Sequence, residues 1–162
     1  MDKTIAGRIH VEELTEKKSE TCREILGALP EWFGIPEAID AYAKDVADLP
    51  MLVARDKSGL VVGFVALKPQ TSAAVEAYVL GVRREWHRNG CGRLLFEAVE
   101  DIVLKRGARF LTVKTLANTH SDPHYVATRL FYEAIGFEPI EVFPTLWSPD
   151  NPCLLMAKTL VG

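Results

Sequence analysis

A long amphipathic segment, with a strand-like run before and after it, is the feature that most restricts the fold. Apolar residues from Arg93 to Lys105 fall on one face at helical spacing, and Gly107 follows where helices commonly end. The apolar runs Ala73–Val82 and Phe110–Leu116 on either side have the length and composition of strands. A helix of this kind must bury its apolar face against another element, so the sequence predicts a fold that mixes helices with a sheet.

The other segments are assigned from the same periodicities. We expect strands over Thr4–Leu14, Met51–Arg55, Leu60–Leu67, Phe137–Phe143 and Cys153–Thr159, and helices over Glu16–Leu29, Pro36–Val46 and Tyr125–Ile135. The turn Asp56–Gly59 joins two of these strands as a hairpin, and Gly81 near the end of its strand predicts a bulge or a close backbone approach. Four prolines between Pro139 and Pro152 predict an irregular connection. The order predicts an α/β (α+β) sandwich on a mixed, mostly antiparallel sheet of about six or seven strands, with about four helices.

Length and composition fit one ordinary globular domain. The chain has 162 residues, and we expect residues 1–162 to form a single domain. Its formal net charge of -3 is unfavourable for general binding to nucleic acid. No apolar run approaches the roughly 20 residues that span a bilayer, and the charged N-terminal segment does not look like a signal peptide. We therefore expect a cytoplasmic protein with no membrane or nucleic-acid partner, whose three scattered cysteines are reduced thiols.

The loop between Ala73–Val82 and the following helix carries the main functional signal. It ends in Gly90-Cys91-Gly92, and the free N–H groups and dipole of a helix N-terminus favour an anion there. Glycines also let the backbone approach a bulky phosphate closely. The same segment contains a cluster of arginines with one opposing glutamate: Arg83, Arg84, Arg88 and Arg93, with Glu85. The pattern indicates a small polyanionic ligand, and the alternative is a glycine-rich helix start with a solvated basic edge.

Two well-known nucleotide loops do not fit this segment. The P-loop requires Gly-x-x-x-x-Gly-Lys-Ser/Thr, which no stretch of the chain provides. The Rossmann loop requires a third glycine at the position that Leu95 occupies. Both classes of nucleotide-binding protein are therefore set aside.

Two motifs instead resemble those of the GNAT acetyltransferase superfamily. The segment His87-Arg88-Asn89-Gly90-Cys91-Gly92 resembles the family's Gln/Arg-x-x-Gly-x-Gly/Ala, with His87 in place of the usual Gln or Arg. The stretch Arg129–Pro139, in which a Phe-Tyr-Glu run precedes Gly-Phe, resembles a later motif of the same family. Both motifs occur in the family's order, and the similarity extends over nearly the whole chain.

The resemblance implies acetyl-CoA as the cosubstrate. In this family it lies where two neighbouring parallel strands splay apart, here Ala73–Val82 and Phe110–Leu116. Backbone groups of the first strand would hold the pantetheine arm, and the amides of the glycine loop would hold the pyrophosphate. The expected binding residues are Leu80, Val82, His87, Arg88, Asn89, Gly90, Cys91, Gly92 and Arg93. The asparagine that many members carry before the Phe-Tyr pair has no counterpart in His124–Arg129, and Asn118 comes earlier.

The resemblance also suggests two catalytic residues. An amine with a pKa of about 10.4 is mostly protonated at pH 7, so a general base assists its attack on the thioester. Glu76 occupies the offset at which some members carry this base, and the alternative is a glutamate that points to solvent. Tyr132 matches the family's acid tyrosine, and the alternative is a tyrosine packed in the core. The Leu80 N–H is the expected oxyanion donor, and we expect no catalytic role for Cys91.

The acceptor stays open at this point. We expect a primary amine on a small molecule, with a protein lysine or N-terminus, or a non-catalytic acyl-CoA-binding domain, as alternatives. The loop residues Trp32, Phe33 and Ile35 are either an apolar wall near the acceptor or core anchors. His120 and His124 have no evident third partner, so we expect no metal site. A homodimer is compatible with the resemblance.

Overall fold

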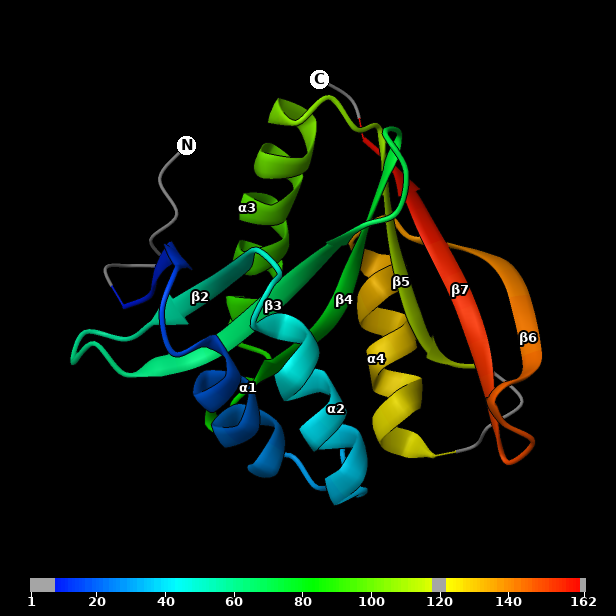
Figure 1. Ribbon diagram of the computed structural model, residues 1–162, viewed down its shortest axis with the longest axis horizontal. Helices are drawn as coiled ribbons and strands as arrows, with labels where there is room; N and C mark the ends of the chain where they lie inside the picture. The colour runs from blue at the N-terminus through cyan, green and yellow to red at the C-terminus, as the bar shows by residue number, and fades with distance from the viewer. Residues whose placement is uncertain (1–7, 118–121, 161–162) are drawn as a thin grey trace.

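Seven strands form one sheet in the computed structural model, which describes residues 8–117 and 122–160 (Figure 1). The strands are β1 (His10–Leu14), β2 (Met51–Arg55), β3 (Val61–Pro69), β4 (Ala74–Val82), β5 (Phe110–Leu116), β6 (Glu138–Ser148) and β7 (Asn151–Thr159), and the α-helices are α1 (Lys18–Gly27), α2 (Pro36–Val46), α3 (Cys91–Lys105) and α4 (Pro123–Ala134). The spatial order of the strands is β1-β2-β3-β4-β5-β7-β6. The predicted mixed sheet with flanking helices is confirmed for the described residues.

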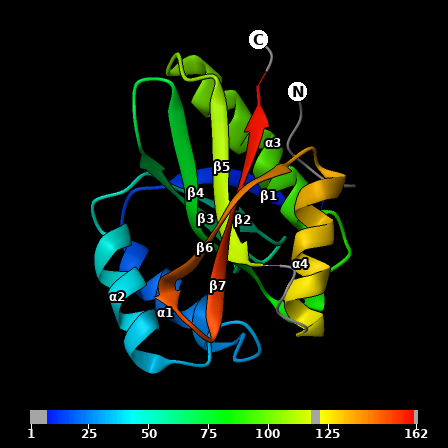
Figure 2. The ribbon, with the colours of Figure 1, turned by 90° about the vertical axis from the view of Figure 1, so that its right-hand side faces the viewer.

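The sheet separates two pairs of helices, with α1 and α2 on one face and α3 and α4 on the other (Figure 2). Ile25, Leu26 and Phe64 belong to the core beneath α1 and α2. Phe96 and Leu111 belong to the core beneath α3 and α4. Burying a large apolar side chain of this kind contributes roughly 1.5–3 kcal/mol, so each face of the sheet is held to its helices by its own apolar cluster.

Strand β4 has a bulge at Tyr78, and the bulge predicted near Gly81 is wrong. Ala66 of β3 pairs with Val79, and the next residue of β3 pairs with Ala77, so Tyr78 is the extra residue. Gly81 instead pairs in regular register, and a Cβ there would lie 3.1 Å from Ile25 Cγ2 of α1. The glycine therefore allows α1 to approach the sheet closely, which was the second expectation for this position.

The irregular connection predicted around the four prolines lies within the β6–β7 pair rather than in a long loop. Strand β6 continues to Ser148 and β7 begins at Asn151, although the pairing register shifts twice along them. Because β6 is the outer strand of the sheet, its prolines do not have to donate a hydrogen bond on the open side. The predicted irregularity is therefore present as a shift of register between Phe143 and Ser148. The strands run further than predicted because Pro139 and Pro144 lie on the edge strand.

Among the described residues, none of the helices combines the length and the apolar character needed to cross a membrane. The part of the predicted first strand before Arg8 lies outside the described residues.

Candidate functional site

Strands β4 and β5 run side by side at one end and diverge at the other. They pair in parallel only over Ala74–Glu76 and Phe110–Thr112. Beyond that point, β4 stays paired with β3 up to Val82, and β5 stays paired with β7 up to Leu116. The splayed parallel strands implied by the family resemblance are therefore present.

The backbone of β4 presents hydrogen-bonding groups toward this opening. The Arg83 N–H donates to the Val62 carbonyl oxygen at 2.7 Å, and the side to which backbone groups point alternates along a strand. The N–H and C=O groups of Leu80 and Val82 therefore point away from β3 and toward the diverging β5, where the Val82 carbonyl oxygen also meets the His87 side chain. A strand-like arm with amide groups would find partners there.

The loop after β4 ends in a helix start that allows close approach. Gly90 has a φ of 82°, in the left-handed region that glycine tolerates best. A Cβ at Gly92 would lie 3.0 Å from Phe131 Cζ, so a side chain there would press against α4. The first turn of α3 contains no acidic residue, and its N-cap makes no side-chain hydrogen bond. This helix start therefore favours an anion.

Several loop side chains hold the loop in place. His87 Nε2 lies 2.6 Å from the Val82 carbonyl oxygen, and because a carbonyl can only accept, this nitrogen carries the proton. The Asn89 side-chain amide donates to the His87 carbonyl oxygen at 3.0 Å. Cys91 is buried, and burial raises the pKa of its thiol to about 12, so a thiolate nucleophile is absent here at neutral pH. The contacts of His87 and Asn89 thus fix the loop backbone.

The basic segment around this loop divides into two parts. Arg83 and Arg84 form ion pairs with glutamates of α1 and of the loop that follows it. Arg88 and Arg93 are exposed, and neither has an ion-pair partner among residues 8–117 and 122–160. Only these two arginines remain available to an anion. Sequence reasoning missed the division because the pairing glutamates lie far away along the chain.

Glu76 is buried at the point where β4 and β5 part. Its side chain is 5% exposed, and its Oε2 accepts a hydrogen bond from Lys114 Nζ at 2.9 Å. Lys114 lies two residues beyond Thr112, the last residue of β5 that pairs with β4. Val75 and Ala77 pack on the α3/α4 side, so Glu76 faces α1 and α2. The structure excludes the solvent-exposed alternative for this residue.

More polar side chains gather on the same face. The Tyr78 hydroxyl donates to Asp45 Oδ2 of α2 at 2.5 Å, and the Tyr42 ring lies edge-on to Tyr78 at 5.5 Å. Burial, and then the Asp45 carboxylate, raises the pKa of Tyr78. Burial, and then the Glu76 carboxylate, raises the pKa of Tyr42. Two carboxylates and two neutral phenols thus lie on the α2 side of β4, and no motif in the sequence signals this grouping.

Tyr132 of α4 lies on the opposite face of the sheet. It is 5% exposed, and its ring packs edge-on against Phe96 at 6.0 Å and Phe137 at 5.6 Å. Burial raises the pKa of Tyr132, so its phenol stays protonated at physiological pH. The ring is a core element, and the role of its hydroxyl as an acid stays a prediction.

The loop between α1 and α2 is tied to α4 through Trp32. Its Nε1 donates to Thr128 Oγ1 at 3.1 Å, and its carbonyl oxygen accepts from the Tyr125 hydroxyl at 2.6 Å. Its ring also lies edge-on to His87 at 5.4 Å and to His124 at 4.9 Å. Trp32 is therefore an anchor that joins this loop to the glycine loop and to α4.

The other two residues of this loop differ from Trp32. Phe33 packs edge-on against Tyr42 at 6.2 Å, whereas Ile35 is 59% exposed. Phe33 therefore belongs to the core beneath α2, and Ile35 lies on the surface.

The histidine pair considered as a metal site is only partly described. His124 Nδ1 lies 3.1 Å from Asp122 Oδ1, and Asp122 caps α4 by accepting from the His124 N–H. His120 and Asn118 lie outside the described residues. In the part of the chain that the structure describes, no three potential ligands come together as a metal site.

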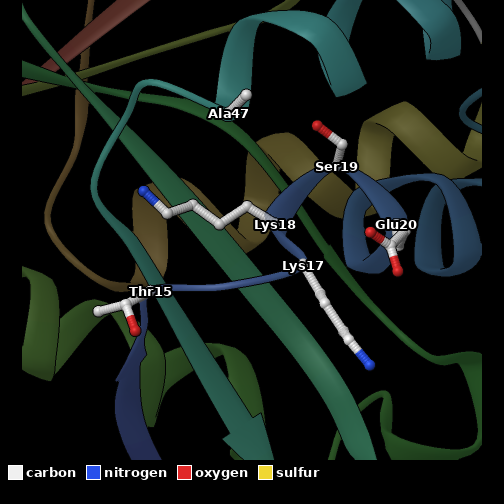
Figure 3. A pocket seen from close by; sticks show the side chains of 6 residues that line it. All are labelled: Thr15, Lys17, Lys18, Ser19, Glu20 and Ala47. Carbon is white, nitrogen blue, oxygen red and sulfur yellow. The ribbon is translucent and has the colours of Figure 1, made fainter.

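A surface hollow of about 200 Å³ lies at the start of α1 (Figure 3). It is lined by Thr15, Lys17, Lys18, Ser19, Glu20 and Ala47. Lys18 Nζ donates to the Leu49 carbonyl oxygen at 2.7 Å, and Ser19 Oγ donates to the Ala43 carbonyl oxygen at 2.5 Å. These groups tie α1 to α2 and to the loop that follows it, and none of the predicted site residues lines the hollow. We therefore assign it no catalytic role.

The geometry at the opening fits the parts of acetyl-CoA. The outward-pointing backbone groups of Leu80 and Val82 suit an amide-containing arm. The start of α3, with the exposed Arg88 and Arg93, suits a pyrophosphate.

Comparisons with known proteins agree with this geometry. A family model described as an acetyltransferase (GNAT) domain matches residues 47–139, which is more than half of the chain. A search of curated proteins finds no significant match. The fold is similar to that of a GNAT-family protein from Desulfovibrio desulfuricans, with a TM-score of 0.80 and 19% identity over 94% of this chain and 99% of that chain.

Two further structures show the same fold. An aminoglycoside 6′-N-acetyltransferase in complex with coenzyme A has a TM-score of 0.73 and 21% identity, over 94% of this chain and 97% of that chain. The ribosomal-protein-S18-alanine N-acetyltransferase from Escherichia coli has a TM-score of 0.74 and 16% identity, over 95% of each chain. The family match and the splayed strands lead to the same conclusion: the chain belongs to the GNAT acetyltransferases, and it is an acyltransferase whose acyl donor is acetyl-CoA.

Proposed function

We propose that the chain acetylates the primary amine of a small molecule by direct attack of the amine on acetyl-CoA. The observation that carries the proposal is that Glu76 is buried where β4 and β5 part, while Tyr132 lies on the opposite face of the sheet. A base on one side and an acid on the other suit a reaction in which the nucleophile arrives from one direction and the leaving group departs in another.

The chain's own residues supply the proton transfers. Acetyl-CoA, when bound, provides the thioester carbonyl at which the amine attacks. Glu76 removes a proton from the amine, directly or through water, while Lys114 fixes the position of the carboxylate. The Leu80 N–H donates to the carbonyl oxygen as negative charge develops on it. Tyr132, kept protonated by burial, donates to the departing thiolate.

The α2 side of β4 supports a small, positively charged acceptor. Asp45 and Glu76 both lie there, and carboxylates attract an ammonium group. The loop that carries Trp32 is held to α4 by hydrogen bonds, which favours a compact acceptor over an extended peptide. One structural neighbour acts, by its name, on aminoglycosides, and another acts on a ribosomal protein, so peptides are the alternative that the experiment has to separate.

A thiol-release assay with acetyl-CoA and a panel of small amines and peptides tests the proposal. We expect turnover with small amines, and a loss of about 10²-fold or more in kcat/KM for Glu76→Gln. Glu141→Gln, which changes an exposed glutamate of β6, is the matched control and should behave as wild type. Turnover restricted to peptides would reject a small-molecule amine as the acceptor. An unchanged pH profile of kcat/KM in Glu76→Gln would reject Glu76 as the general base.

A further inference from the structure

The side chain of Thr115 has a buried hydroxyl without a hydrogen-bond partner. The residue is 3% exposed. Its Oγ1 is the one buried side-chain nitrogen or oxygen that lacks a partner in residues 8–117 and 122–160. Proteins rarely leave such a group unpaired because its lost hydration is not replaced. A hydroxyl in this state can therefore pair with a group that the protein itself does not supply.

Thr115 lies on the part of β5 that has separated from β4. It comes three residues after Thr112, where pairing with β4 ends, and it is in register with Leu154 of β7. Leu154 and Val113 belong to the core beneath α3 and α4. Because side chains alternate along a strand, Thr115 faces this same side of the sheet.

The contacts of the next residue place Thr115 close to the helix that carries Tyr132. The Leu116 carbonyl oxygen accepts from Arg129 Nη1 at 2.8 Å. Arg129 precedes Tyr132 by three positions on α4, so both lie on the same face of the helix. Thr115 and Tyr132 therefore approach the open end of the strands from the same side.

We propose that the Thr115 hydroxyl hydrogen-bonds the pantetheine arm of acyl-CoA where the arm passes between β4 and β5. The inference rests on the proposed function for the identity of the ligand. A hydroxyl both donates and accepts, so it can pair with either half of an amide group. The backbone of Leu80 and Val82 hydrogen-bonds the arm from the β4 side, and the Thr115 hydroxyl hydrogen-bonds it from the β5 side.

Calorimetric titration with CoA and thermal unfolding of the free protein together test this role. Thr115→Val keeps the shape of the side chain and removes the hydroxyl. The Kd for CoA should rise about three- to tenfold, as expected for one lost hydrogen bond. The Tm of the free protein should rise by about 2–4 °C, because an unsatisfied buried group has been removed. Thr115→Ser keeps the hydroxyl and should retain the wild-type Kd.

Thr112→Val is the matched control on the same strand. The Thr112 hydroxyl donates to Gln70 Oε1 at 2.8 Å, so its removal should lower the Tm and leave the Kd for CoA unchanged. A Kd for Thr115→Val within twofold of wild type, or a Tm that falls as in Thr112→Val, overturns the inference and leaves the proposed function standing. Failure of the wild-type protein to bind CoA overturns both.

Discussion

Replacing Lys114 with methionine is expected to destabilise the protein, because Glu76 would remain buried without its partner. The two charged groups are 2.9 Å apart, and their side chains are 28% and 5% exposed, respectively. Methionine keeps most of the apolar length of lysine, so the change mainly removes the charge. The carboxylate cannot regain full hydration without moving the strands apart.

The size of the effect follows from the geometry of the pair. At 2.9 Å the Coulomb attraction is about 6 kcal/mol at an effective dielectric of 20, and the cost of burying the charges offsets most of it. Removing one partner of a fully buried pair costs roughly 3–5 kcal/mol. Because solvent reaches part of Lys114, we expect a loss of about 2–3 kcal/mol in the free energy of unfolding.

Urea unfolding at neutral pH measures the coupling free energy between Glu76 and Lys114. The proteins compared are the wild type, Lys114→Met, Glu76→Gln and the double variant. We expect a coupling free energy of about 2 kcal/mol and a double variant that is more stable than Lys114→Met. Lys158→Met is the control, because its partner Glu100 is 25% exposed and a better-hydrated pair should lose about 1 kcal/mol or less. A coupling below about 0.5 kcal/mol at Glu76–Lys114 would refute the reasoning.

Three further predictions follow from named contacts. Tyr132→Phe should lower kcat by about 10²-fold in the thiol-release assay and leave the Kd for CoA within twofold, whereas equal losses in both would indicate a binding role. Gly92→Ala should lower the free energy of unfolding by about 1 kcal/mol in thermal or urea unfolding, because the new Cβ would lie 3.0 Å from Phe131 Cζ; a more stable variant would contradict this contact. Burial raises the thiol pKa values of Cys22 and Cys91 to about 12, against about 8.5 when unfolded. Their contribution to stability should be complete below about pH 8.5 and should fall as the pH rises toward 12, by up to about 1.4 kcal/mol per pH unit for each thiol. In urea unfolding of the double variant Cys22→Ala and Cys91→Ala, the free energy of unfolding should fall less steeply as the pH rises. An unchanged slope would show that other groups cause the fall.

Local patterns in the chain predicted most of the secondary structure. Helix α2 and strand β5 have the predicted bounds, Pro36–Val46 and Phe110–Leu116, because a proline at a helix start and a short apolar run are signals that neighbouring residues can produce alone. The same reasoning ended β6 too early, at Phe143 instead of Ser148, because the effect of a proline depends on whether its strand lies at the sheet edge. It also misplaced the bulge of β4, which lies at Tyr78 rather than near Gly81.

The sequence by itself determined the family and the anion-favouring loop, because Gly90 acts through the local backbone of one turn. Only the tertiary structure decided how the charged and polar side chains are partnered. It joins Glu76 to Lys114 across two strands and leaves Thr115 without a partner where those strands separate. These pairings depend on strand register, and register is set by the packing of the whole sheet against its helices rather than by neighbours along the chain.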